Sequence, residues 1–454
     1  MAERTIVTLG DTLAALVEGK KYTTLRDILV TMNAVDVAAI FEDMPQDKLP
    51  LLFRLLPKEL AAETFVEMDP ETQELLIQGF SDNELKDVVD ELYVDDAVDI
   101  VEEMPANVVK RILKQADPEM RKMINEILKY PDDSAGSIMT TEYVSLRPNM
   151  TVEEAIKRIR RVGVDKETIY TCYVTETNRK LIGMISMRTL ILADDDDVIE
   201  DIMESNVISA NTLEDQESVA QMFTKYDFSA LPVVDQENRL VGIVTVDDAI
   251  DVLQEETTED FEKMAGMAPS EETYLKTPPF KLAKNRIIWL LVLMLSAMVT
   301  GGLLEHYEAA IAGLPLLVSF IPMLMDTGGN CGAQASTMII RGLALDEIEL
   351  KDFFRVWWKE IRVALICGAA LSAVNFIRII IQYGDIGVAA VVSLTLIITV
   401  CVAKSLGCIL PIIAKRLKLD PAIMASPIIT TLTDACSVFV YFTIATAMLR
   451  GRLI

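Results

Sequence analysis

Apolar residues in the first 130 positions recur at the three- and four-residue spacing of amphipathic helices. A short phrase returns three times: FEDMP from Phe41, FVEMDP from Phe65 and VEEMP from Val101. Each copy follows an apolar-periodic run and ends at a proline, which interrupts a helix. Helical repeats that cannot bury their apolar faces alone stack against their neighbours. We therefore expect residues 1–130 to form an N-terminal α-helical superhelix.

Between residues 131 and 252 the pattern changes to short extended runs that alternate with helices. LIGMISMRTLI from Leu181 and LVGIVTVDDAI from Leu240 are the same phrase, 59 residues apart. An extended apolar segment and an amphipathic helical run precede each copy, with turn residues between them. This order predicts two α+β units of the form strand–helix–strand–strand–helix, at residues 131–203 and 204–252.

Residues 253–280 are expected to connect these units to the rest of the chain. Their first half continues the helical pattern of the second unit and is acidic on one side. Pro278 and Pro279 end any helix there, because proline lacks the backbone donor that a helix interior needs.

The last part of the chain has five hydrophobic spans, at residues 286–306, 314–341, 360–382, 387–414 and 422–449. Lys and Arg gather before the first span and in the second and fourth connections, whereas the first and third connections contain none. By the positive-inside rule the N-terminal domains are cytosolic and the C-terminus lies outside the cell membrane, although Arg450 and Arg452 oppose this. Residues 1–30 are polar and mixed, unlike a signal peptide.

Charge is divided sharply along the chain. The formal net charge is −27, and residues 1–280 hold 58 Asp and Glu against 27 Lys and Arg. Such a surface repels phosphate, which excludes nucleic acid as a partner and favours cations. A solvated acidic surface that only aids solubility is the alternative. The single histidine, His306, excludes histidine-based catalysis, and the six cysteines show no CxxC spacing.

The last span contains one formal charge, Asp434. An ionised carboxylate inside a bilayer costs several kcal/mol unless it faces water, a cation or a partner. Ser426, Thr430 and Asp434 are spaced by four, so their oxygens lie on one face of a helix. A stripe of oxygens without histidine or lysine suits a hard cation. The alternative is a structural aspartate that is hydrogen-bonded to a hydroxyl of a neighbouring helix.

The second span carries a polar insertion, MDTGGNCGAQAST, from Met325 to Thr337. Its glycines permit close helix approach or a local break, and the amides of Asn330 and Gln334 offer carbonyl oxygens. A helix-packing seam of small residues is the alternative. Two spans thus present oxygen ligands, which Mg²⁺, Ca²⁺ and Mn²⁺ prefer. One aspartate per chain, doubled across a two-fold axis, suits a hydrated Mg²⁺, which loses its waters reluctantly.

Several phrases resemble known families. FSALPVVD and VGIVTVDD make residues 131–252 similar to a tandem pair of cystathionine-β-synthase (CBS) domains. With IPMLMDTGGNCGAQASTMIIRGLA and DPAIMASPIITTLTDA, nearly the whole chain resembles the MgtE family of magnesium channels. The resemblance implies a multidomain membrane protein that forms a homodimer in the bilayer, with a connecting "plug" helix at 253–280 and a five-helix transmembrane domain at 281–454.

The same resemblance implies a pore lined by the second and fifth spans. Its metal-binding pore positions fall on Asp434, Thr430, Ser426 and Asn330. Asp326, a further acid beside the motif, is expected near a pore mouth.

The resemblance also implies feedback by cytosolic Mg²⁺, which holds the N domain, CBS pair and plug helix in a closed state. Like charges at helical spacing destabilise one another, so clusters of uncompensated carboxylates need cations. One of Asp95 and Asp96 is implied as a sensor. The remaining sensor positions are Glu217, Asp227, Asp248, Asp251, Glu256, Glu259 and Asp260. For any single one of them a solvated surface residue is the alternative.

ATP binding is a further implication of the CBS pair, and both its presence and its absence stay open. Asp248 would bind ribose hydroxyls, Tyr170 would stack on the base and Arg188 would contact phosphate. The candidate nucleotide residues are Tyr170, Arg188, Phe228, Ser229, Pro232 and Asp248.

Other functions fit the sequence less well. An enzyme is not expected, because the chain contains no P-loop, nucleophile elbow, zinc motif or paired histidines. A CBS-regulated transporter of an organic anion would need basic groups in the membrane, and only Lys404 and Arg378 qualify. Lys404 lies mid-span and must snorkel or pair with an acid. A nucleotide receptor that is merely anchored leaves Asp434 unexplained. The sequence therefore predicts a Mg²⁺-selective channel or transporter, and leaves open Mn²⁺ and Co²⁺ as ions and a carrier as mechanism.

Overall fold

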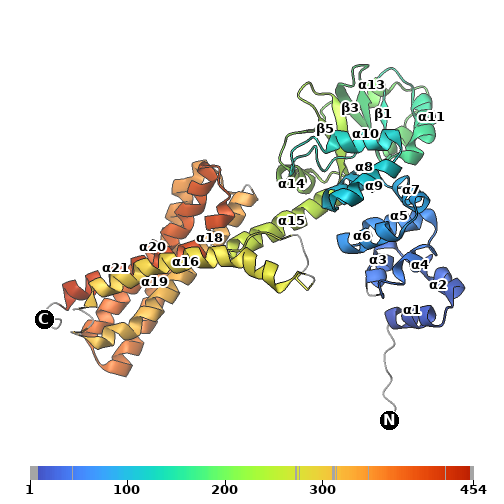
Figure 1. Cartoon of the computed structure of the whole chain (residues 1–454). Coiled ribbons are helices and arrows are strands. Elements are labelled where there is room, and N and C mark those ends of the chain that lie inside the picture. Colours follow the sequence, from blue (N-terminus) through green and yellow to red (C-terminus); the bar gives the residue numbers. More distant parts are fainter. Residues whose placement is uncertain are drawn as a thin grey trace, which may run out of the picture. The chain divides into compact units, whose positions relative to one another are not determined.

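The computed structural model divides the chain into two compact units, Met1–Leu253 and Gln254–Ile454, which we call the N-terminal and C-terminal units. Each unit is described by itself. The structure describes residues 9–42, 44–270, 274–275, 277–308, 312, 314–345, 347–424 and 426–449. Figure 1 labels their helices and strands.

The described residues of the N-terminal unit begin with an array of ten short helices (blue to cyan in Figure 1). These are α1 (Leu9–Glu18), α2 (Tyr22–Leu29), α3 (Ala34–Glu42), α4 (Leu49–Phe53), α5 (Lys58–Val66), α6 (Pro70–Gly79), α7 (Asp82–Val89), α8 (Val94–Glu103), α9 (Ala106–Gln115) and α10 (Pro118–Ile127). Helix α3 packs on α5, α5 on α7, α7 on α9 and α8 on α10, so the array grows by pairing every second helix.

The repeated phrases of the sequence lie at the junctions of this array. Pro45 follows α3, Pro70 is the first residue of α6, and Pro105 is the N-cap of α9. The first turn of a helix tolerates proline, because a backbone N–H at that position would have no partner within the helix. Each phrase therefore ends a helix, the second and third also lead directly into the next one, and buried apolar residues of all three join one continuous core.

Two three-stranded sheets follow, with matching order and register. Their strands are β1 (Ser145–Leu146), β2 (Thr171–Thr175) and β3 (Leu181–Ser186) in the first, and β4 (Ala210–Asn211), β5 (Ala230–Val234) and β6 (Leu240–Thr245) in the second. In each sheet the first strand is parallel and the third antiparallel to the second. Cys172 pairs with Ile185, and the residues 59 positions later, Leu231 and Val244, pair in the same way.

The two sheets are joined by reciprocal hydrogen bonds between their hairpins. The Leu181 N–H donates to the Asn238 carbonyl at 3.0 Å, and the Leu240 N–H donates to the Arg179 carbonyl at 2.9 Å. Helices α11 (Val152–Val162), η1 (Gly163–Asp165), α12 (Met187–Leu192), α13 (Ile199–Ile202) and α14 (Gln216–Tyr226) complete the two repeats. The repeat predicted from the sequence is thus a structural pseudo-symmetry.

Helix α15 (Val246–Met264) starts in the second repeat and is continuous across the predicted domain boundary at residue 253. Gly266 follows it with a φ of +71°, a left-handed conformation that glycine adopts without strain. The predicted plug segment extends to residue 280, but its residues 271–273 and 276 lie outside the described part of the chain.

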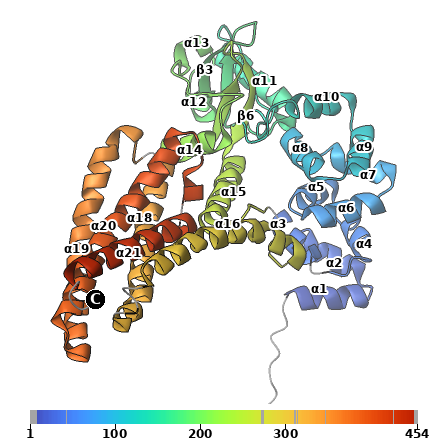
Figure 2. The same ribbon diagram turned by 60° about the vertical axis from the view of Figure 1, so that its left-hand side comes forward.

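Within the described residues, four helical stretches are long and apolar enough to cross a membrane. They are Pro279–His306 (α16), Leu350–Tyr383 (η3, Leu350–Asp352, and α19, Phe353–Tyr383), Ile386–Arg416 (α20) and Pro421–Met448 (η4, Pro421–Met424, and α21, Ser426–Met448). Helix α18 (Ile321–Ala344), preceded by η2 (Pro315–Phe320), corresponds to the second predicted span but is more polar. Because it packs against both α20 and α21, it belongs to the same bundle, seen in Figure 2. Its crossing of the membrane stays a prediction.

The basic residue Lys404 on α20 is buried, with 5% of its surface exposed. Its Nζ lies 3.3 Å from Oε2 of Glu360 on α19. Arg378, the other basic candidate, places its guanidinium 6.0 Å from the centre of the Phe320 ring. The ammonium of Lys404 is therefore neutralised by a neighbouring helix.

Removing one partner of this ion pair should destabilise the bundle strongly. Glu360→Gln leaves a buried ammonium without its counter-charge, which costs about 3–5 kcal/mol, whereas replacing both partners by apolar residues is far less costly. We expect Glu360→Gln to lower the apparent Tm in detergent and the double variant Glu360→Leu/Lys404→Met to recover most of the loss. The exposed Glu347 supplies the control variant, Glu347→Gln. An equal, small effect of both single variants would contradict the role of the pair.

Candidate metal-binding sites

On helix α18, the residues suited to helix packing and those suited to ion binding occupy different faces. Its glycines lie buried: a Cβ at Gly329 would lie 3.0 Å from Cγ2 of Thr430, and one at Gly332 would lie 2.6 Å from Cγ2 of Ile429. Asp326, Asn330 and Gln334 are exposed and spaced by four residues, so they form a stripe on one helix face. The glycines therefore form a packing seam with α21, and the oxygen-bearing side chains are on exposed positions of the same helix.

Helix α21 carries the predicted pore aspartate. Asp434 is half-buried, and among the described residues it forms no ion pair, while Asp326 of α18 is close enough to act on it electrostatically. The Thr430 hydroxyl, one turn earlier, donates to the Pro427 carbonyl at 3.0 Å, which leaves its oxygen able to accept or to ligate. The side chain of Ser426 lies outside the described part of the chain. Helices α18 and α21 pack together, and Asp326 of the first lies near Asp434 of the second.

A group of carboxylates gathers in the N-terminal unit where α8 begins. Burial raises the pKa of Asp95 well above its usual range, and the negative charges of Asp248 and Asp96 act in the same direction. Burial, followed by Asp248 and Asp247, raises the pKa of Asp96 to about 7. Burial also raises the pKa of Asp248, although Thr245 donates to it from its backbone N–H and its hydroxyl. The structure therefore brings the predicted sensors of α8 and α15 together.

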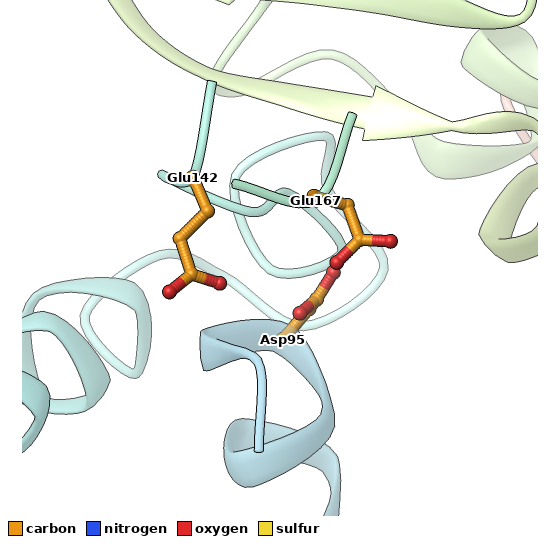
Figure 3. A group of neighbouring side chains, drawn as sticks. All are labelled: Asp95, Glu142 and Glu167. Carbon is orange, nitrogen blue, oxygen red and sulfur yellow. The ribbon is translucent and has the colours of Figure 1, made fainter. Parts of the chain in front are cut away.

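Two glutamates that the sequence analysis missed complete this group. Figure 3 shows Asp95 with Glu142, which precedes β1, and Glu167, which follows η1; one oxygen of each lies within 4.8 Å of the others. Burial, followed by the charges of Asp96 and Asp247, raises the pKa of Glu167 to about 8. Neither glutamate belongs to a repeated phrase, so the sequence offers no signal for them.

The C-terminal half of α15 belongs to the C-terminal unit. Its carboxylates were expected to be uncompensated, and that expectation was wrong, because Lys263 lies 2.5 Å from Oε1 of Glu259 and 2.8 Å from Oδ2 of Asp420. Asp420, which precedes η4, was not anticipated. Burial raises the pKa of Asp260 to about 6, Asp420 acts in the same direction, and Lys263 opposes both. A lysine at the i+4 position was the sequence signal for this pairing.

The end of α15 is fixed against the start of α21. A Cβ at Gly266 would lie 3.1 Å from Cγ of Pro427, three residues before Thr430. The Ala268 N–H donates to the Asn285 carbonyl at 3.0 Å. Met264 packs against Ile340 and Ala422. Within this unit, the connecting helix therefore contacts the helix that carries Asp434.

The remaining predicted sensors lie on α14 or elsewhere on α15. Glu217 accepts a hydrogen bond from Nε2 of Gln221 at 3.1 Å, and Asp227 ends α14 with a φ of +55°. Burial and Asp251 both raise the pKa of Glu67, a neighbour that the sequence analysis did not name. Glu256 is half-buried on α15. As sensors, Glu217, Asp227 and Glu256 stay predictions.

The candidate nucleotide-binding residues differ in exposure, and some of them contact neighbouring segments. Tyr170 and Arg188 are exposed, and the Tyr170 carbonyl accepts from the Met187 N–H at 2.8 Å, which joins their two segments. The Phe228 ring stacks on Tyr226, with centroids 5.4 Å apart. Pro232 is buried within β5, and Ser229 next to it is exposed. Asp248 is shared with the acidic group, so one carboxylate would have to serve both sites.

Comparison with known families covers most of these elements. The model described as the MgtE intracellular N domain matches residues 32–133, and the CBS domain matches residues 135–196 and 199–255. The model described as a divalent cation transporter matches residues 321–444, from the first residue of α18 into α21.

Relatives align over almost the whole length. The magnesium transporter MgtE of Thermus thermophilus is 36% identical over 99% of this chain and 100% of its own. The chain belongs to the MgtE family. The magnesium transporter MgtE of Bacillus subtilis is 33% identical over 96% of both chains. A crystal structure of the cytosolic domain of the Mg²⁺ channel MgtE in complex with ATP is 37% identical, with a TM-score of 0.52 over 54% of this chain and all of that one.

Membership of the MgtE family accounts for the order of the elements. A second solved structure, the soluble part of a magnesium transporter, is 32% identical, with a TM-score of 0.51 over 54% of this chain and 97% of that one. The matches to the N-domain and CBS models contain the acidic group at α8, and the transporter match contains Asn330, Thr430 and Asp434.

The acidic group predicts a pH dependence of stability in the absence of divalent cations. Asp96 and Glu167 have folded pKa values of about 7 and about 8, above their usual values of 3.8 and 4.5. The folded state therefore binds more protons than the unfolded state in this window, and the free energy of unfolding falls as pH rises through it. We expect the Tm measured in EDTA to fall between about pH 5 and about pH 8, and millimolar Mg²⁺ to flatten the profile. A flat profile in EDTA would contradict the prediction.

Proposed function

We propose that this protein is a Mg²⁺-selective channel or transporter for magnesium uptake, gated by cytosolic Mg²⁺ that binds its acidic residues. One observation carries the proposal: a half-buried carboxylate without a basic partner among the described residues, Asp434, lies on a membrane helix packed against the helix of the Asn330 stripe. Intramembrane acids of this kind mark ion pathways. Relatives that align over the full length are named magnesium transporters.

The pore is formed between two copies of the chain. Asp326, Asn330 and Gln334 are exposed along α18, and such groups are unfavourable against lipid. A homodimer whose two-fold axis runs along this face would surround them with water and double Asp434. Two carboxylates with neutral oxygens cannot supply the 6–8 direct ligands that Ca²⁺ takes, whereas Mg²⁺ keeps several of its waters. Selectivity for Mg²⁺ then follows from binding the hydrated ion.

Asp434→Ala should abolish Mg²⁺ uptake while leaving the dimer intact, because it removes the only charge of α21. Asp434→Asn should fail as well, since it keeps the size and loses the charge. Uptake is measured by growth of a strain deficient in Mg²⁺ transport and by Mg²⁺ flux into liposomes, and the assembly by size-exclusion chromatography. Cys436→Ala, two residues further on, is the matched control. Wild-type growth supported by Asp434→Ala would show that the pore assignment is wrong.

Gating follows from the distribution of carboxylates. The sensor comprises one of Asp95 and Asp96 with Glu217, Asp227, Asp248, Asp251, Glu256, Glu259 and Asp260. When cytosolic Mg²⁺ is scarce, repulsion within the acidic group at α8 moves α15, the plug helix. Movement of α15 then reaches the pore through the contact of Gly266 with Pro427 at the start of α21. The N-terminal domains lie in the cytosol and the C-terminus outside, as the loop charges favour.

Neutralising four of these sensors should remove the feedback. Asp248→Asn/Asp251→Asn/Glu259→Gln/Asp260→Asn removes four carboxylates on which the proposed Mg²⁺ response depends, one of them the ion-pair partner of Lys263, so millimolar cytosolic Mg²⁺ should no longer inhibit the flux. Protection of residues 255–280 from protease by Mg²⁺ should be lost in parallel. The control removes the same number of charges from exposed acids of the first CBS repeat: Asp194, Asp195, Asp196 and Glu200. Unchanged inhibition and protection in the first variant would place the sensor elsewhere.

ATP is proposed as a modulator at the CBS pair. The support is the cytosolic domain of a relative solved in complex with ATP, together with the exposed Tyr170 and Arg188. Binding would place ribose at Asp248, whose carboxylate also faces the acidic group. ATP and Mg²⁺ would therefore act on α15 through the same residue.

A further inference from the structure

An open groove lies between α19 and α20 of the C-terminal unit, two helices that pack together (Figure 2). Its volume is about 410 Å³, and apolar atoms line almost all of it. The apolar lining residues include Ile361 and Leu365 of α19 and Ile397, Cys401, Val402 and Leu406 of α20. Both helices are long and apolar enough to cross a membrane. An open apolar groove on such helices requires an apolar occupant.

The length of the groove matches one leaflet of a bilayer. On α20 the lining residues run from Ile397 to Leu406, which is about 14 Å of helix at a rise of about 1.5 Å per residue. The hydrocarbon core of a bilayer is roughly 30 Å thick, so each leaflet contributes about 15 Å. The groove therefore has the length of one acyl chain that enters from one side of the membrane.

Three basic residues lie on the N-terminal part of α19. Arg355, Lys359 and Arg362 are exposed, and their spacing by four and three residues places them on one helix face. Among the described residues none of the three forms an ion pair, and the acid in the same segment, Glu360, is paired with Lys404. The three positive charges are therefore available to an external anion.

Two tryptophans connect these charges to one end of the groove. Nε1 of Trp357 donates to Oγ of Ser405, a polar residue of the lining, at 3.2 Å. The neighbouring Trp358 is 56% exposed, and its carbonyl accepts from Nε of Arg362 at 3.4 Å. Tryptophan is enriched where the membrane meets water, because its ring is apolar and its N–H is polar. This end of the groove therefore lies at the level of the lipid headgroups.

We propose that the groove binds one anionic phospholipid, with an acyl chain between α19 and α20 and its phosphate at Arg355, Lys359 and Arg362. Each Lys or Arg near the membrane surface favours an anionic lipid by about fivefold, and a zwitterionic lipid gains no such preference. The groove supplies the contact with the chain, and the charges supply the selectivity. Binding rests on these features alone, and only the leaflet that provides the lipid rests on the orientation proposed above.

Quenching of tryptophan fluorescence by brominated lipids tests the site in the full-length protein. The chain has three tryptophans, so Trp289→Phe leaves Trp357 and Trp358 as the reporters at the end of the groove. The protein is placed in vesicles of phosphatidylcholine and phosphatidylglycerol, with bromine on the acyl chains of one lipid at a time. At equal mole fraction, brominated phosphatidylglycerol should quench more strongly. Equal quenching by the two lipids would overturn the proposal. Absence of quenching by either would also overturn it, because a second copy of the chain would then cover the groove.

Removal of the basic residues separates a specific site from general attraction to an anionic membrane. Arg355→Gln/Lys359→Gln/Arg362→Gln should lose the preference for phosphatidylglycerol, by about fivefold for each charge removed. Three basic residues at the start of α16 supply the matched control: Lys281→Gln/Lys284→Gln/Arg286→Gln. The control should keep the preference. An equal loss in both variants would show that the lipid is attracted without a site.

A variant that blocks the groove supplies a second measurement and leaves all basic residues in place. Val402→Phe places a larger side chain in the lining, so quenching by brominated phosphatidylglycerol should fall to the level of phosphatidylcholine. Unchanged quenching would show that the chain does not occupy the groove. Size-exclusion chromatography and the Tm of each variant verify that it is folded.

The site and the proposed function fail in different ways, because lipid binding is measured without Mg²⁺. A preference for phosphatidylglycerol in a protein that transports no Mg²⁺ supports the site and contradicts the proposed function. Mg²⁺ flux without any lipid preference supports the function and overturns the site.

Discussion

Repulsion between carboxylates that are buried together is the interaction on which the N-terminal unit depends. The packing of α8 against the CBS pair brings Asp95, Asp96 and Asp248 together. After burial, the charges of Asp248 and Asp96 raise the pKa of Asp95, and the charge of Asp248 raises the pKa of Asp96. Such a group is stable only when protons or cations neutralise it, since burial penalises every unpaired charge. Protons do so below the raised pKa values of about 7 for Asp96 and about 8 for Glu167, and above them a cation would be needed. This requirement is the physical basis of the proposed sensitivity to cations.

In the C-terminal unit, some charged side chains form ion pairs, whereas Asp434 forms none among the described residues. Lys404 and Glu360 neutralise each other between α19 and α20, as Lys263 and Asp420 do at the end of α15. Among the described residues, Asp434 has no such ion pair and is accompanied by another acid, Asp326. An acid left without a basic partner in a membrane helix is the feature on which the proposed role of Asp434 in ion transport rests.

The polar motif of α18 shows how one helix serves packing and chemistry together. Small residues allow the backbones of α18 and α21 to approach, as the positions of Gly329 and Gly332 against Thr430 and Ile429 show. The amides of Asn330 and Gln334 are exposed on the same helix. Packing and the proposed ion binding are therefore compatible explanations of the motif, because buried glycines serve the first and exposed oxygen groups would serve the second.

The sequence by itself determined the features that depend on local spacing. Helical periodicity located the array and the hydrophobic helices, and the 59-residue repeat anticipated the matching pairs Cys172–Ile185 and Leu231–Val244. The tertiary structure alone decided which distant side chains meet. Glu142 and Glu167 reach Asp95 because α8 docks on the first repeat, and Glu360 reaches Lys404 because α19 packs on α20. Periodicity records which face of an element is buried but not what covers that face, so contacts across long separations cannot be read from it.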